Sequence, residues 1–160
     1  MKKFKFNCYN ALAAMAVVSA LAAAACSDDM VEPDDHPEAE GVQLIMGGNV
    51  IASYDGDTQT WTGELEVDAG EETPHIRVVF VDHDGDPVEL EDDTYLEVDI
   101  EDTSIAEFEQ DTPGEFGGHL HGHMEGDTDV TFKLMHGQVG SGHADFVTQP
   151  VHAHVHEHEG

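Results

Sequence analysis

The chain has 160 residues, of which 35 are acidic, 12 are histidine and only five are lysine or arginine, so its formal net charge is −30 at pH 7. Such a charge excludes attraction to nucleic acid or to anionic lipid as a basis for binding, because both carry the same sign. A salt-loving or marine source and selection for cation binding would each explain the acidity, and charge alone does not separate them.

The first 25 residues are typical of a secretory signal. Lys2, Lys3 and Lys5 form a basic start, and an alanine-rich apolar stretch follows over 11–25. The stretch is too short and too rich in alanine for a stable transmembrane helix. We therefore expect residues 1–25 to direct export.

The sequence LAAAAC at 21–26 resembles the lipobox of bacterial lipoproteins, although Ala23 stands where that family prefers leucine. The resemblance implies cleavage before Cys26 and lipidation of its thiol, which would anchor the protein to a membrane of the bacterial cell envelope. Ser27, directly after the cysteine, implies the outer membrane, with the protein facing the periplasm or the cell surface. The alternative is an ordinary secretory signal in which Cys26 is incidental.

The number of cysteines limits which metal sites and catalytic groups the mature protein can contain. Cys8 lies in the segment expected to be removed and Cys26 is the expected lipidation site, so no disulfide and no thiolate ligand remains. A catalytic cysteine, a zinc finger and a blue-copper site are excluded on this basis.

Residues 27–40 combine acids with Pro33 and Pro37, and we expect 26–40 to be a lipidated cysteine with a disordered acidic tether. From Gly41 onward the chain is typical of short strands separated by turns, with no helical periodicity. Pro150 in the last strand indicates an edge position or a bulge. The expected strands cover 42–46, 49–54, 60–67, 75–81, 94–100, 105–109, 116–124, 129–135 and 145–157. This pattern predicts a single all-β domain over 41–160, folded as an antiparallel β-sandwich.

The stretch GELEVDAGEETPHIRVVFVDHDGDPVE, the segment DTSIAEF and the stretch GEFGGHLHGHMEGDTDVTF resemble bacterial Ig-like domains of group 2 over about 63–156. The resemblance implies an Ig-like β-sandwich that serves as an extracellular module, without catalysis. Where that family places small or hydroxyl residues, this chain places histidines. The histidines are therefore the feature in which this chain differs most from that family.

Nine of the 12 histidines lie at or beyond residue 119, and most alternate with apolar or glycine residues. They form three groups: His119, His121 and His123; His136 and His143, which flank GQVGSG; and His152, His154, His156 and His158. Residues i and i+2 of a strand point the same way about 6.6–7 Å apart, so imidazoles can lean together onto one ion at about 2.0–2.1 Å. Neutral imidazole suits zinc or copper, and also nickel or cobalt. Nearby acids can serve as further ligands or as acceptors behind the ligands: Glu125, Asp127, Glu157 and Glu159.

Ig topology would place the 119–123 group on one sheet and the last two strands on the other. The expected cooperative set is then His136, His143 and His152–His156, although two separate weak sites are equally consistent with the pattern. The function predicted is capture or buffering of a divalent transition metal in the envelope, with a metal transporter or a TonB-dependent receptor as partner. The alternative is a structural or adhesive Ig-like module in which the histidines are incidental.

Two other motifs are weaker indications of function. DHDGD at 82–86 has the first acids of a calcium loop, but Pro87 occupies the position that needs glycine, which favours a β-turn. GHLHGHMEGD resembles the histidine strand of copper–zinc superoxide dismutase, but that family's disulfide is absent. No enzymatic activity is expected.

Overall fold

The computed structural model describes residues 39–157, and the expected signal, Cys26, most of the tether and His158 lie outside this range. Ala39 packs against the core, and the Glu40 amide donates to the Val81 carbonyl at 2.8 Å. The folded region therefore already includes the last two residues of the expected tether. Within 39–157 no helix is long and apolar enough to cross a membrane.

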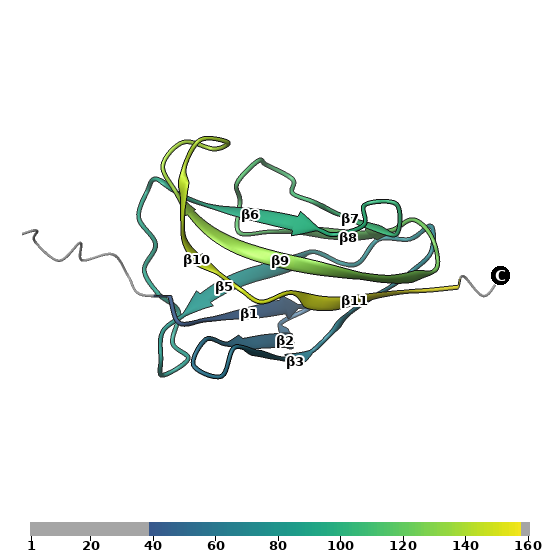
Figure 1. Ribbon diagram of the computed structural model, residues 1–160, viewed down its shortest axis with the longest axis horizontal. Helices are drawn as coiled ribbons and strands as arrows, with labels where there is room; N and C mark the ends of the chain where they lie inside the picture. Colours follow the sequence, from purple (N-terminus) through teal and green to yellow (C-terminus); the bar gives the residue numbers. More distant parts are fainter. Residues whose placement is uncertain (1–38, 158–160) are drawn as a thin grey trace, which may run out of the picture. The chain divides into compact units, whose positions relative to one another are not determined.

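Eleven strands form in the described range (Figure 1). Six of them belong to the first sheet, in the order β3-β2-β1-β5-β8-β7, and the other five to the second sheet, where β9 pairs with β6, β10 and β11, and β11 pairs with β4. The strands are β1 (Gly41–Met46), β2 (Asn49–Asp55), β3 (Thr60–Gly63), β4 (Leu65–Asp68), β5 (Ile76–Val81), β6 (Thr94–Ile100), β7 (Ala106–Glu109), β8 (Gly117–Gly122), β9 (Gly126–His136), β10 (His143–Val147) and β11 (Val151–His156).

The predicted all-β Ig-like sandwich is confirmed. Strands β5, β8 and β7 lie in one sheet while β6, β9 and β11 lie in the other, which is the division that Ig domains make between their B, E, D and C, F, G strands. All pairings are antiparallel except that of β11 with β4, which is parallel. The sandwich is therefore mixed rather than purely antiparallel.

Two predicted strands are each divided in the structure. The expected strand 60–67 is β3 in the first sheet and β4 in the second, because the chain crosses between sheets at Gly63, whose φ is 88°. A Cβ at Gly63 would lie 2.3 Å from the Ile51 carbonyl oxygen, so glycine is required there.

The expected strand 145–157 is interrupted at 148–150, leaving β10 and β11 paired with different stretches of β9. Pro150 lies in this interruption. The edge position proposed for the final strand is wrong for β11, because β11 lies between β9 and β4. The interruption supplies the irregularity that proline needs without removing a hydrogen bond from β11.

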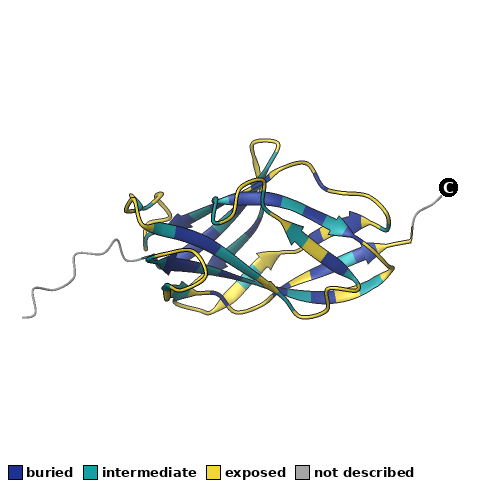
Figure 2. Cartoon of the chain, turned by 90° about the horizontal axis from the view of Figure 1, so that it is seen from above, coloured by how far each residue is buried: buried dark blue, intermediate teal, exposed yellow. Residues whose placement is uncertain are grey.

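The core lies between the sheets and is built from alternate residues of each strand (Figure 2). On β9 the predicted inward residues Val130, Phe132 and Leu134 are all buried. On β11 the buried residues are Val151, Ala153 and Val155, so His152, His154 and His156 face outward. The period of two in the last strand therefore has a structural cause: one parity fills the core and the other faces solvent.

Replacing Val155 with alanine should lower the free energy of unfolding by about 2–3 kcal/mol, because two methyl groups leave a fully buried site. The matched control is Val50→Ala on the exposed part of β2, where the same change should stay within about 0.5 kcal/mol. Urea unfolding of both variants in the presence of a chelator measures the difference. Equal losses would contradict the assignment of the inward face of β11.

Candidate metal centres

Each of the ten histidines in the described range has a carboxylate oxygen within 4.0 Å of a ring nitrogen. They are His75, His83, His119, His121, His123, His136, His143, His152, His154 and His156. Arg77 and Lys133 are the only lysine or arginine residues in the same range. Imidazole is thus the main partner that this acidic surface has for its carboxylates.

The outward face of β11 carries one row of rings between acidic neighbours. In register, His152 lies opposite Asp129 and His154 lies opposite Asp127 on β9. The Asp127 Oδ1 atom lies 2.6 Å from His154 Nδ1 and 3.2 Å from His152 Nε2. These three side chains bring their donor atoms within 4.8 Å of one another. They form the first group, which we call the β11 cluster: Asp127, His152 and His154.

The hydrogen bond between His154 and Asp127 changes the acidity of both side chains. It raises the pKa of His154, and the nearby negative charges of Asp127, Glu64 and Glu66 raise it further. The same bond lowers the pKa of Asp127. The ring of His156 packs edge-on against that of His154, with centroids 4.4 Å apart, and its Nε2 lies 3.7 Å from Glu66 on β4.

A second group, the β9–β10 cluster, consists of His136, His143 and Asp145. His136 and His143 are directly opposite in the β9–β10 pair, and their rings stack at 5.3 Å. His136 Nδ1 lies 3.5 Å from one oxygen of Asp145, and His143 Nε2 lies 3.1 Å from the other. Ligand atoms of a tetrahedral zinc ion are about 3.3–3.5 Å apart, given bonds of about 2.0–2.2 Å. The two nitrogen–oxygen separations are close to that spacing, and all three donor atoms lie within 4.8 Å of one another.

Asp93 fixes the orientation of the His136 ring from the opposite side. Its Oδ2 atom lies 2.8 Å from His136 Nε2, so the imidazole donates its Nε2 proton there and directs Nδ1 toward Asp145. A metal-binding histidine is commonly held by a carboxylate in this way. The hydrogen bond to Asp93 also raises the pKa of His136, with help from the charges of Asp145 and Glu91.

The third predicted histidine group does not converge. His119, His121 and His123 face outward from the β8 side of the first sheet, but they form no three-donor group with one another. His121 lies 3.2 Å from Glu109 and 3.5 Å from Glu72, and His123 lies 3.4 Å from Glu107. These two rings are therefore paired with separate carboxylates, beside a groove of about 490 Å³.

The predicted cooperative set is wrong as a single site. His136 ends β9 and Asp127 lies near its start, so the β9–β10 cluster and the β11 cluster occupy opposite ends of the same strand. The predicted separation of the 119–123 group from the final strands is confirmed, because β8 and β11 belong to different sheets. In the described range no three-donor group contains more than two imidazoles. Carboxylates supply the third donor.

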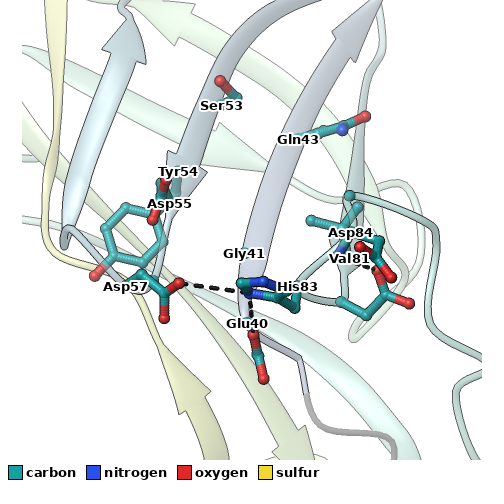
Figure 3. A pocket seen from close by; sticks show the side chains of 13 residues that line it. Glu40, Gly41, Gln43, Ser53, Tyr54, Asp55, Asp57, Val81, His83 and Asp84 are labelled. Carbon is teal, nitrogen blue, oxygen red and sulfur yellow. Dashed lines mark hydrogen bonds and ion pairs between the residues drawn. The ribbon is translucent and has the colours of Figure 1, made fainter.

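A group of Glu91, Asp93 and His136 shares its histidine with the β9–β10 cluster. Sequence reasoning also missed two groups that share no residue with the clusters above. One is Glu40, Asp57 and His83, in which His83 Nδ1 lies 3.4 Å from each carboxylate at the edge of a cavity of about 280 Å³ (Figure 3). The other is His75, Asp111 and Glu115. Both draw on isolated histidines in turns or connections, where no periodic pattern marks them.

Comparison with known proteins gives a partial structural similarity. No protein-family model matches the chain, and no curated protein matches it. Among solved structures, domains 4 and 5 of the S-layer protein SbsC are similar, with 18% sequence identity and a TM-score of 0.42. The similar region covers 59% of this chain and 48% of the S-layer chain.

With metal removed by a chelator, the protein should become less stable as the pH rises from about 6 to about 8.5. The pKa values of His136 and His154 are raised in the folded state, so their stabilisation is complete below about pH 6.5 and disappears as the pH passes the folded values.

The measurement is the Tm across this pH range for the wild type and for the double variant His136→Gln, His154→Gln. The double variant should show a shallower fall. A Tm that rises with pH, or an equal slope in both proteins, would show that these ion pairs do not stabilise the fold.

Proposed function

We propose that this protein binds a divalent transition metal ion, with the β9–β10 cluster as the principal site and the β11 cluster as a second site. The observation that carries the proposal is the convergence of His136 Nδ1 and His143 Nε2 on the two oxygens of Asp145, while Asp93 holds the other nitrogen of His136. Two imidazoles and a carboxylate leave a fourth position for water or a further ligand.

The donor set favours borderline metals. Neutral imidazole and carboxylate suit zinc and copper(II) first, with nickel and cobalt also accepted. The β11 cluster is the less prepared of the two, because its 2.6 Å contact between His154 and Asp127 is a hydrogen bond that an ion must replace. The ring of His136 is only 17% exposed, whereas that of His154 is 38% exposed. The β9–β10 cluster thus has one well-enclosed imidazole, while its other, His143, is 73% exposed.

In the cell we propose that a lipid-anchored protein of the bacterial envelope uses these sites to capture or buffer metal. The anchor would be Cys26, at the outer membrane, with a metal transporter or a TonB-dependent receptor receiving the ion. The support is the start of the chain, which resembles a secretory signal with a lipobox, together with the surface groups of His, Asp and Glu that could hold a metal ion.

The competing proposal is a structural or adhesive Ig-like module. It is favoured by the pairing of every described histidine with a carboxylate, since such a pair relieves repulsion between acids without any metal ion when its histidine is protonated. If this proposal is right, binding of a partner survives replacement of the histidines. If metal capture is right, the same replacement abolishes binding of the ion.

Zinc titration of the untagged protein against a chromophoric chelator should give a tight site that Asp93→Asn weakens about 10- to 100-fold, because a neutral amide accepts a weaker hydrogen bond from His136 than the Asp93 carboxylate and makes its ring a less basic ligand. His136→Gln should abolish the site. The affinity should fall as the pH drops, because the ligands must be neutral, and the fall should begin above about pH 6.5 since the pKa of His136 is raised.

The matched control is His123→Gln, an exposed histidine directly after β8 that pairs only with Glu107 among the groups described above. It should leave the tight site intact. The proposal fails when no ion binds stoichiometrically with a Kd below about 1 µM. It also fails when His123→Gln lowers the affinity for zinc as much as His136→Gln does.

A further inference from the structure

On the opposite sheet, His75, His119, Asp111 and Glu115 come together from three separate parts of the chain. His75 directly precedes β5, His119 lies on β8, and both acids belong to the loop between β7 and β8. His75 Nε2 lies 4.0 Å from Glu115 Oε1, and His119 Nε2 lies 4.0 Å from Asp111 Oδ1. The two rings meet edge-on with centroids 5.4 Å apart. Two imidazoles and two carboxylates therefore face one region of the surface.

His119 is held with one nitrogen directed toward the acids. Its Nδ1 lies 2.8 Å from the Thr73 carbonyl oxygen, which can only accept a hydrogen bond, so Nδ1 carries the proton in the neutral ring. The lone pair is then on Nε2, the nitrogen nearest Asp111. A backbone carbonyl that fixes the tautomer in this way is a recurrent support for a metal-binding imidazole.

The acidic loop is also held in place. The Asp111 amide donates to Glu115 Oε1 at 2.8 Å, which positions that carboxylate. The side chain of Gln110 donates to the Glu115 carbonyl at 2.7 Å and to the Leu96 carbonyl at 3.2 Å. The loop is thus bonded both to itself and to the neighbouring sheet.

The absence of a side chain at Gly117 makes room for the ring of His75. A Cβ at Gly117 would lie 2.4 Å from His75 Cε1 and 2.9 Å from His75 Nε2. The imidazole therefore rests directly on the backbone of β8, close to His119. His75, which belongs to no alternating pattern in the sequence, is thereby placed beside His119 on β8.

We propose that His75, His119, Asp111 and Glu115 form a separate binding site for a divalent transition metal on the first sheet. The donor atoms of His75, Asp111 and Glu115 already lie within 4.8 Å of one another. His119 is the outermost of the four donors, with its Nε2 4.0 Å from Asp111 Oδ1, and its ring must move toward the other three to reach the spacing of tetrahedral zinc ligands. Two nitrogens and two oxygens complete a four-coordinate set without a ligand from outside. His119 therefore ligates with His75 and the acidic loop, and not with His121 and His123, its neighbours on the same face. The site is independent of the β9–β10 and β11 clusters, so either proposal can fail alone.

Zinc titration of the ¹⁵N-labelled untagged protein at about pH 7.5, followed through the histidine ring nitrogens, tests this site. The background is a variant in which the second-sheet histidines His136, His143, His152 and His154 are all replaced with glutamine. The expected result is retention of one zinc ion, with the ¹⁵N shift of His119 Nε2 moved by coordination while Nδ1 keeps its proton. His75→Gln with His119→Gln in this background should remove the ion.

The matched control is His121→Gln, two residues along the same face of β8, which should change neither the stoichiometry nor the His119 signals. Chelator-treated samples of every variant, compared by Tm and by amide spectra, establish that each one is folded. The proposal is overturned when zinc leaves the ring nitrogens of His119 unchanged, or when His121→Gln removes the ion as effectively as the double substitution. In the wild type, a response at His119 without one at His136 and His143 would instead overturn the proposed function alone.

Discussion

The two-sided character of a pleated strand is the constraint on which both the fold and the candidate sites depend. On β11, valine and alanine fill the core while histidines occupy the other parity. Because β11 is hydrogen-bonded to β9 on one side and β4 on the other, its register is set twice. A slip of one residue would bury imidazoles and expose valines, so the same burial energy that stabilises the sandwich also fixes the outward direction of the rings.

Outside the core, the surface is governed by a shortage of cations. Because Arg77 and Lys133 are the only lysine or arginine residues in the described range, most carboxylates that have a basic neighbour lie next to a histidine ring. The carboxylates raise the pKa values of His136 and His154, which places a proton where a metal ion would bind. The same acids that attract a cation and supply a ligand thus also increase the competition from protons. The proposed metal ion would therefore compete with protons for the same donor atoms.

Much of the sandwich could be predicted from the sequence, because alternation reports burial directly. The range 94–100 was predicted as a strand and is β6, and the inward parity of β9 and β11 follows from their apolar residues. The division of 60–67 could not be predicted, because Glu64 to Val67 continue an amphipathic alternation through the point where Gly63 redirects the chain.

The sequence could predict that histidines would form the candidate sites, but not which residues would come together in each site. Periodicity identified the outward histidines, but their partners depend on strand register and loop geometry. Asp145 on β10 and Asp93, which directly precedes β6, contact His136 from two different sides, and His75 reaches His119 only because Gly117 leaves space for it. The contacts of His136 with Asp93 and of His75 with His119 join residues far apart in the chain, which a local pattern does not report.

Trp61, the only tryptophan of the chain, links the two sheets at one edge of the sandwich. From β3 its indole Nε1 donates to the Gln149 carbonyl at 2.6 Å, in the connection between β10 and β11, and its ring lies 6.0 Å from that of Phe132 on β9. The native chain therefore contains its own optical probe of sheet closure. Parting of the layers would expose the indole to water and shift its emission to longer wavelength, with no label attached.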